Sequence, residues 1–357
     1  MKKFFLLPFL SFTLIVTAQN GNTTEKPEEV IPPTATATTD SLSKIQAIKI
    51  SQTLAPPSND STIMKVEASA QDINDMMAAL MTDDLLKKKG IKVSDKLPEA
   101  EKEIKALFDE LLNKDTNDEE RIKINQQIFE KMQATLRLSG SFFYQFNSLK
   151  NMGRIYSDDY NVRAYTWCCE MEDMSYKFYG FIQDLENDKV YRLEQRSDNP
   201  SLSFREVFVP SESDILAPYR WYGALYYKII NIKKGNEPKY ILLGWSQLNP
   251  NLKMKVIDVL QLEEEKMQLG SAMFKGYNTR VPRGLATRIV FPYCANMNMS
   301  IVYNEKDKCF IFDHITPLSD ENGNPLGCNG PDMSYDMLKK KGSKWVLKTD
   351  VDVKNKE

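Results

Sequence analysis

The sequence predicts an α+β protein in which an N-terminal helical segment precedes a large antiparallel β-rich domain, sandwich or barrel-like in form. Three observations predict it. Apolar residues recur at helical spacing between residues 69 and 140. From Phe142 onward, short runs rich in β-branched and aromatic residues alternate with turn signals. The short spacing between these runs favours hairpins over strand–helix–strand units.

The chain begins with the pattern of an export signal. Lys2 and Lys3 precede an apolar run, residues 4–16, and Val16 and Ala18 suit the positions before a signal-peptidase cut. The run is shorter than the roughly 20 apolar residues that a membrane-spanning helix needs. We therefore expect residues 1–18 to be a cleaved signal peptide. The mature protein is expected to be soluble, periplasmic or extracellular, and without a transmembrane segment.

Residues 19–68 read as a disordered linker. The segment is rich in Thr, Pro, Asn and Ser and contains no aromatic residue. Pro32 and Pro33 remove two backbone donors that a β-ladder would need. Because so little apolar surface is available to offset the entropy of ordering, we expect a spacer without fixed structure.

Three helices are predicted within residues 69–140. In the first, Ser69 can act as the cap and Gly90 ends the helix. The second has Pro98 in its first turn, where a proline is tolerated. The third opens with Thr116-Asn117-Asp118-Glu119, which fits a capping box. Each carries an apolar face, so the helices are expected to pack on one another and on the domain that follows.

Residues 141–357 are predicted to form the antiparallel β-rich domain. The segment is long enough for one domain with a substantial core. Turn signals such as residues 157–159 and 305–307 separate the expected strands. These strands are residues 154–156, 162–169, 176–183, 190–195, 223–230, 240–245, 255–260, 286–290, 297–303, 309–314 and 344–348.

Composition argues against several classes of function. The formal net charge is −2, and loss of the two signal-peptide lysines moves it to −4. A mildly acidic protein is a poor match for a nucleic-acid partner bound through a basic face. The chain has one histidine, His314, which leaves no HExxH motif and no three-histidine zinc site. We therefore predict no catalytic residue, no metal site and no cofactor, and we lean toward a protein that is not an enzyme.

The five cysteines are odd in number, so at least one stays unpaired within the chain. Cys168 and Cys169 are adjacent and would leave a strand on opposite faces. A bridge between Cys294 and Cys309 could form if their strands paired in register. We expect instead that these residues, with Cys328, are buried free thiols.

Residues 311–336 contain the most distinctive candidate site, because the single histidine stands there among carboxylates and aromatics. Two interpretations stay open. The segment could bind a ligand, or it could close a hairpin in which Asp332 caps backbone amides and Tyr335 locks the hairpin onto the sheet. Flat aromatics elsewhere could form a sugar platform, although a β-domain core uses the same residues. The candidate ligand-binding residues are Asp313, His314, Asp332, Tyr335, Asp336, Trp221 and Trp245.

Several blocks of the β-rich domain carry a resemblance. They are residues 165–167 with 179–183, 221–230, 243–245, 255–260, 312–314, 330–336, and Trp345 with 350–352. As a set they resemble a group of exported, functionally uncharacterised proteins of Bacteroidetes, over about residues 142–355. The resemblance implies export, and it carries over no activity, ligand or catalytic residue.

The leading hypothesis is an exported, non-enzymatic binding or envelope-associated protein, whose unidentified partner is an envelope protein or a glycan. It rests on the spacer, the aromatic-rich β-domain and the lack of a catalytic motif. One alternative is a hydrolase of glycans or envelope polymers that uses paired carboxylates near Asp313, Asp332 or Asp336. Another is a structural subunit of an envelope assembly whose partner covers the helical face.

Overall fold

The computed structural model describes residues 85–113, 116–195, 210–232, 238–264, 266–276 and 284–352. All of them belong to one compact unit, Asn74–Val353. The predicted signal peptide, the predicted linker and most of the first predicted helix lie outside the described residues. Within these residues, no helix is long and apolar enough to cross a membrane.

Two long helices follow the end of the first predicted helix: α3 (Leu97–Asn113) and α4 (Asp118–Leu136). The capping box of α4 lies one residue later than predicted. Asn117 Oδ1 accepts from Glu120 N at 2.9 Å, and Asn117 N donates to the Glu120 carboxylate at 3.3 Å. The Thr116 hydroxyl instead accepts from Arg121 Nε. Thr116 with Glu119 has the same spacing, so the sequence pattern alone does not distinguish the two caps.

The helices pack on the first of three sheets. An apolar cluster joins Phe129 of α4 to Trp167 of the sheet, with ring centroids 5.7 Å apart. The Trp167 indole N–H donates to Asn125 Oδ1 at 3.1 Å, which satisfies two buried polar groups at once. This sheet has the order β1-β2-β3-β4 and is antiparallel throughout. Its strands are β1 (Gly153–Tyr156), β2 (Val162–Glu170), β3 (Tyr176–Asp184) and β4 (Lys189–Glu194).

The second sheet has the order β11-β7-β6-β5, and β8 also pairs with β7. A buried cluster that includes Phe178 from the first sheet and Tyr226 from the second forms the core shared by the two. A bulge interrupts the pairing of β5 with β6 between Tyr226 and Lys228. The strands are β5 (Leu225–Asn231), β6 (Lys239–Asn249), β7 (Leu252–Glu263), β8 (Lys266–Leu269) and β11 (Ile289–Cys294), and the 3-10 helix η1 (Pro218–Arg220) precedes β5.

The third sheet has the order β10-β9-β15-β14-β13-β12. A second core cluster joins it to the other face of the second sheet, where the rings of Phe291 and Phe312 lie 4.9 Å apart. Between the described strands of this sheet, β15 and β9 pair in parallel and the other pairs are antiparallel. The strands are β9 (Phe274–Lys275), β10 (Leu285–Ala286), β12 (Ile301–Asn304), β13 (Cys309–Ser319), β14 (Pro325–Lys341) and β15 (Lys344–Lys348).

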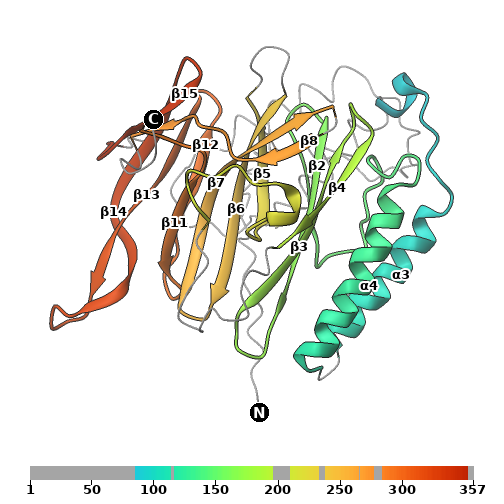
Figure 1. Ribbon diagram of the computed structural model, residues 1–357, viewed down its shortest axis with the longest axis horizontal. Helices are drawn as coiled ribbons and strands as arrows, with labels where there is room; N and C mark the ends of the chain where they lie inside the picture. Colours follow the sequence, from blue (N-terminus) through green and yellow to red (C-terminus); the bar gives the residue numbers. More distant parts are fainter. Residues whose placement is uncertain are drawn as a thin grey trace, which may run out of the picture. The chain divides into compact units, whose positions relative to one another are not determined.

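The described residues therefore form four layers: the helices and then three sheets, with an apolar core between successive layers (Figure 1). The predicted β-rich architecture with a few helices and antiparallel sheets is confirmed. The largest departure from the predicted strands is β14, which spans 17 residues. Its first half, Pro325–Asp332, reads as a turn because it contains proline, glycine and asparagine. Pairing with β13 nevertheless holds it extended.

Candidate functional site

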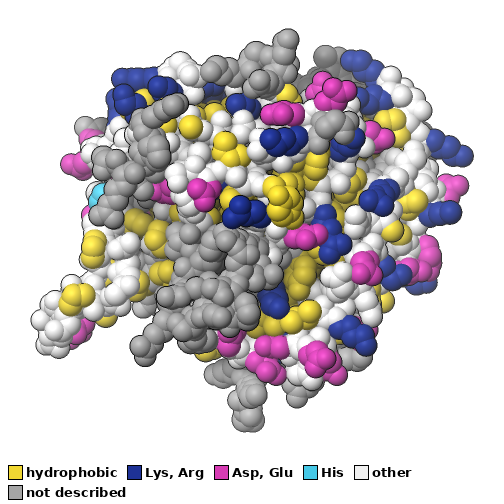
Figure 2. All heavy atoms as spheres, viewed as in Figure 1, with side chains coloured by type: hydrophobic (Ala, Val, Ile, Leu, Met, Phe, Trp, Pro, Cys, Tyr) yellow, Lys and Arg dark blue, Asp and Glu magenta, His cyan; other side chains and the backbone are white. Residues whose placement is uncertain are grey.

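The candidate segment predicted from the sequence forms the outer part of the β13–β14 hairpin. Among the described strands, β13 pairs with β12 only as far as Phe312, and β14 pairs with β15 only from Met337. Between these limits β13 and β14 pair only with each other. We call residues 313–336 the ribbon. It extends beyond its neighbouring strands in Figure 1, and its tip stands out from the surface in Figure 2.

His314 and Asp336 face each other across the base of the ribbon. His314 Nδ1 lies 2.9 Å from Asp336 Oδ2, and the main-chain N–H of Asp350 donates to Asp336 Oδ1 at 3.2 Å. The Asp336 side chain is 7% exposed, whereas that of His314 is 36% exposed. The hydrogen bond to Asp336 raises the pKa of His314, and the negative charges of Asp336, Asp332 and Asp350 add to the effect. The pair is a partly hydrated ion pair when His314 is protonated.

The other two candidate aspartates of the segment, Asp313 and Asp332, also accept main-chain hydrogen bonds. Asp313 Oδ2 accepts from the N–H of Ser300 at 2.7 Å. Asp332 Oδ1 accepts from the Ser334 hydroxyl at 2.7 Å and from the Ser334 N–H at 3.0 Å. These two bonds hold the pKa of the exposed Asp332 carboxyl below its ordinary value. Each candidate carboxylate therefore accepts at least one main-chain hydrogen bond.

Met333 occupies an unusual position between Asp332 and Ser334. Its side chain is 95% exposed, and its φ of +71° lies in the left-handed region that non-glycine residues rarely adopt. The register of the ribbon shifts here, since Asp313 pairs with Tyr335 while Ile315 pairs with Pro331. The bulge thus presents Met333 outward. The other large apolar side chains that the ribbon exposes are Leu326 at 52% and Tyr335 at 41%.

A disulfide between Cys294 and Cys328 fastens the ribbon to the end of β11. The prediction that both are free thiols is wrong, and so is the alternative bridge from Cys294 to Cys309. Cys309 is buried in the third sheet opposite Lys339, whereas Cys328 lies where the ribbon passes the end of β11. Beside it, the Asn329 side-chain amide donates to the Pro292 carbonyl at 3.5 Å. Cys168, Cys169 and Cys309 are free, as predicted.

The two candidate tryptophans lie in different environments. Trp221 is fully buried, and its indole N–H donates to the Tyr226 hydroxyl at 2.9 Å. That hydroxyl lies 3.1 Å from the Tyr222 hydroxyl, and burial raises the pKa of both tyrosines. Trp245 is half-buried and packs against Phe178. Trp221 therefore belongs to the core, and the structure does not bring the two tryptophans together as one exposed platform.

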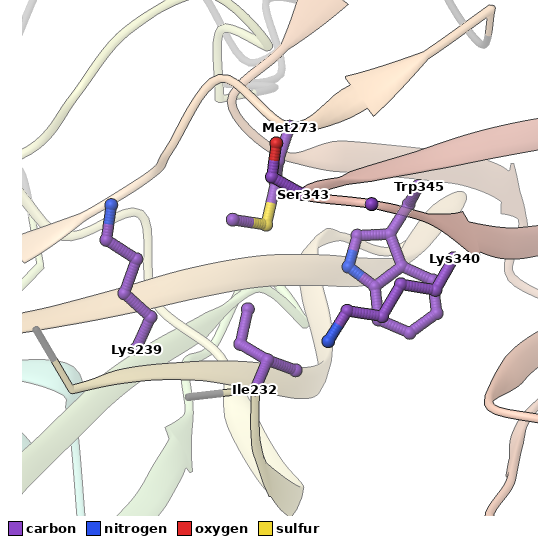
Figure 3. Close-up of a pocket in the computed structure, with 7 residues that line it drawn as sticks. Ile232, Lys239, Met273, Lys340, Ser343 and Trp345 are labelled. Atoms are coloured by element: carbon purple, nitrogen blue, oxygen red, sulfur yellow. The ribbon is translucent and has the colours of Figure 1, made fainter. Parts of the chain in front are cut away.

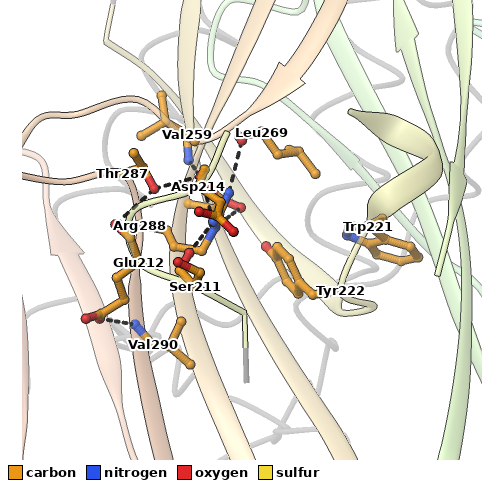
Figure 4. Close-up of polar contacts among 12 residues, drawn as sticks. Ser211, Glu212, Asp214, Trp221, Tyr222, Val259, Leu269, Thr287, Arg288 and Val290 are labelled. Carbon is orange, nitrogen blue, oxygen red and sulfur yellow. Dashed lines mark hydrogen bonds and ion pairs between the residues drawn. The ribbon is translucent and has the colours of Figure 1, made fainter. Parts of the chain in front are cut away.

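Sequence reasoning missed a buried polar network around Arg288 (Figure 4). Arg288 and Asp258 are both fully buried, and Arg288 Nε lies 3.1 Å from Asp258 Oδ2. Asp258 Oδ1 also accepts from the N–H of Val259 at 2.7 Å. The remaining guanidinium donors bind main-chain carbonyls, so the network closes a connecting loop onto the second sheet. The carbonyls belong to Ser211, Asp214 and Leu269.

No sequence signal identifies this network, because its members are isolated residues far apart in the chain. Neighbouring Thr287 also secures this loop. Its hydroxyl donates to the carbonyls of Glu212 and Asp214, at 3.0 and 2.9 Å. The Glu212 carboxylate in turn accepts from Val290 N at 3.1 Å. The arrangement uses the fully buried Arg288–Asp258 pair to secure a loop.

Comparisons with known proteins add no assignment. No family model, no curated protein and no solved structure matches the chain. In the part of the chain that the structure describes, no group of three or more His, Cys, Asp or Glu residues could hold a metal ion.

Proposed function

We propose that the protein is exported and serves as a non-enzymatic, envelope-associated binding protein whose partner is another envelope protein. The ribbon is the proposed contact surface. The observation that carries the proposal is that β13 and β14 extend beyond their neighbouring strands and expose Met333 at the bulge. Large exposed apolar side chains on a projecting element are typical of protein contacts.

Export is supported by two independent features. Residues 1–18 have the charge and apolar pattern of a secretory signal. The disulfide between Cys294 and Cys328 is a bond that persists in oxidising compartments and is rare in the cytosol. The proposed location is therefore the periplasm or the extracellular side of the envelope.

The outer edge of β13 is the proposed docking edge. Beyond Asp313 this edge has no neighbouring strand among those described, so its main-chain N–H and C=O groups can pair with an extended segment of another chain. The edge of β14 is less available, because Val351 N donates to the Tyr335 carbonyl at 2.9 Å. The disulfide holds the ribbon in place before a partner arrives, which lowers the entropic cost of binding.

The candidate carboxylates favour binding over hydrolysis. A glycoside hydrolase needs two carboxyl groups that face one substrate. Asp313 and Asp332 instead cap main-chain amides, and Asp336 is shared by His314 and the amide of Asp350. A protein partner is favoured over a glycan because Trp221 is buried and so cannot serve as a sugar platform.

For the β-rich domain, we infer a sandwich form in which the second sheet is shared by two successive sandwiches. Two separate apolar clusters, one on each face of that sheet, support this form. Two stacked sandwiches of this kind would give the ribbon a rigid support.

Site-specific photocrosslinking tests the function. A photoreactive residue at position 333 of the full chain should crosslink to one protein in the native envelope. The same residue at position 302 is the control, since Val302 is 53% exposed on β12 but lies outside the ribbon. Leu326→Asp should weaken the crosslink from position 333. Equal yields from both positions, or none from either, would overturn the proposal. A stable complex of fixed stoichiometry would identify the protein as a structural subunit.

A further inference from the structure

Lysines gather on the outer face of the third sheet, at the end of β14 away from the ribbon tip (Figure 1). Leu338 is fully buried in the core between the second and third sheets, so Lys339 beside it points to the opposite, outer face. Trp345 is 1% exposed in the same core, so Lys344 also points outward. The same alternation defines a set of exposed lysines that we call the basic face: Lys275, Lys339, Lys341, Lys344 and Lys348.

Lys340 is not part of the basic face. It pairs with Trp345 across the hairpin and lies on the inner side of the sheet, with its Nζ 6.0 Å from the centre of the indole ring. Figure 3 shows its side chain beside that ring, at the edge of a small hollow. The lysines of the β14–β15 hairpin therefore divide between the two faces of the sheet.

The positive charge of the basic face is not compensated within the described part of the chain. None of its lysines forms an ion pair there. Lys341 and Lys344 stand directly opposite each other on β14 and β15, which is unfavourable for like charges. The adjoining turn, residues 305–308, has two lysines and two carboxylates and so adds no net charge. An external anionic partner would relieve the repulsion.

The chemistry of the basic face fits a charged bilayer better than a protein partner. Protein interfaces are depleted in lysine and enriched in arginine, whose planar group makes paired hydrogen bonds. The basic face contains lysines and no arginine, so it provides diffuse attraction in place of shape-specific contacts. Its charges also lie on one side of a sheet, so they can approach a broad surface together. Figure 2 shows Lys and Arg side chains gathered at the upper left, where β14 and β15 end in Figure 1.

We propose that the basic face docks onto the surface of an anionic phospholipid bilayer, with its ammonium groups against the lipid phosphates. This contact is additional to the protein partner proposed for the ribbon. Because the ribbon tip lies at the other end of β14, it is not part of the docked face.

Co-sedimentation with vesicles tests the proposal on protein isolated from cells. At low ionic strength the protein should bind vesicles that contain phosphatidylglycerol and should not bind vesicles of pure phosphatidylcholine. Each lysine near an anionic bilayer strengthens binding about fivefold. Lys339→Ala, Lys341→Ala and Lys344→Ala combined should therefore weaken binding to the anionic vesicles by about 100-fold.

A second triple variant is the matched control. Lys96→Ala, Lys102→Ala and Lys123→Ala remove the same charge from exposed lysines in or beside the helices, and should leave vesicle binding unchanged. Changing the three lysines of the basic face to arginine should retain binding, because the charge is kept. High salt should release the wild-type protein, since it screens exposed charges.

Several results would overturn the proposal. They are equal binding to neutral and anionic vesicles, equal losses in the two alanine variants, and no binding to anionic vesicles. Binding to polyglutamate without binding to vesicles would also overturn it, in favour of an acidic polypeptide partner. No residue of the ribbon is changed in these experiments, so their outcome is independent of the photocrosslinking result.

Discussion

The ribbon and the Arg288 network each place an aspartate against a cationic side chain, yet the two pairs differ in hydration. Asp336 faces a histidine that is 36% exposed, whereas Asp258 and Arg288 are both fully buried. Water screens the first pair and lets it titrate. The second pair has lost its hydration and depends on complete hydrogen bonding. We therefore expect the fold to depend less on the His314–Asp336 pair, although it is the pair more visible in the sequence.

Asp258→Ala should give the largest loss of stability. It would leave the Arg288 guanidinium buried without its counter-charge, which costs about 3–5 kcal/mol. Urea unfolding measures the change. Asp313→Ala in the ribbon is the comparison variant, and a loss from Asp313→Ala as large as that from Asp258→Ala would break the distinction between the two regions. Replacing both Asp258 and Arg288 with leucine should recover only part of the loss, because three main-chain carbonyls would lose their donor.

Removing the disulfide should give the next largest effect. Cys294→Ser combined with Cys328→Ser is expected to lower the free energy of unfolding by about 2–4 kcal/mol. Limited proteolysis should then cut the ribbon before it cuts the sheets. Reductant supplies the control: it should destabilise the wild-type protein by a similar amount and leave the double variant unaffected. An unchanged wild-type protein would show that the disulfide does not hold the ribbon.

Replacing the methionine at the bulge should stabilise the protein. Met333→Gly removes the strain of a left-handed residue, which is worth about 1 kcal/mol. The same change removes the side chain proposed to contact the partner, so crosslinking from a photoreactive residue at position 326 should fall. Thermal unfolding and crosslinking yield together test the point. A loss of stability in Met333→Gly would mean that the methionine side chain supports the fold.

The smallest effect is expected from His314. Its pKa is raised by Asp336, so the folded state binds this proton more tightly than the unfolded state does. The stabilisation is fully present below the ordinary histidine pKa of 6.5 and is lost as the pH rises through the raised value. Because His314 is more than one-third exposed, we expect less than about 1 kcal/mol.

His314→Gln should therefore melt below the wild type at about pH 5.5 and match it more closely at about pH 9, where the imidazole is neutral. The difference between the two melting curves at each pH is the measurement. A difference that grows toward alkaline pH would reverse the assigned sign.

Local pattern was sufficient to predict several elements. The expected strands 162–169, 176–183 and 344–348 match Val162–Glu170, Tyr176–Asp184 and Lys344–Lys348 closely, because alternation and turn residues bound them on both sides. No part of β14 was predicted as a strand, and in its first half Pro325, Gly327 and Gly330 locally favour a turn. Pairing with β13, the preceding strand of the same hairpin, holds that segment extended.

The sites were harder to predict than the strands. His314 and Asp336 were both named as candidates, but their pairing depended on the hairpin of β13 with β14, which was not predicted. Cys328 was hidden for the same reason. Arg288 and Asp258 carry no motif because tertiary packing alone brings them together.

The position of β15 has a consequence for the order of folding. Lys344–Lys348 is the last described strand of the chain, yet it lies in the interior of the third sheet, between β14 and β9. Synthesis from the N-terminus releases this strand after the other described strands. Until then β9 and β10 have no connection to β14 within the sheet, and their edges stay open. Chains that end before Lys344 would therefore keep the third sheet in two pieces, with unpaired edges prone to aggregation.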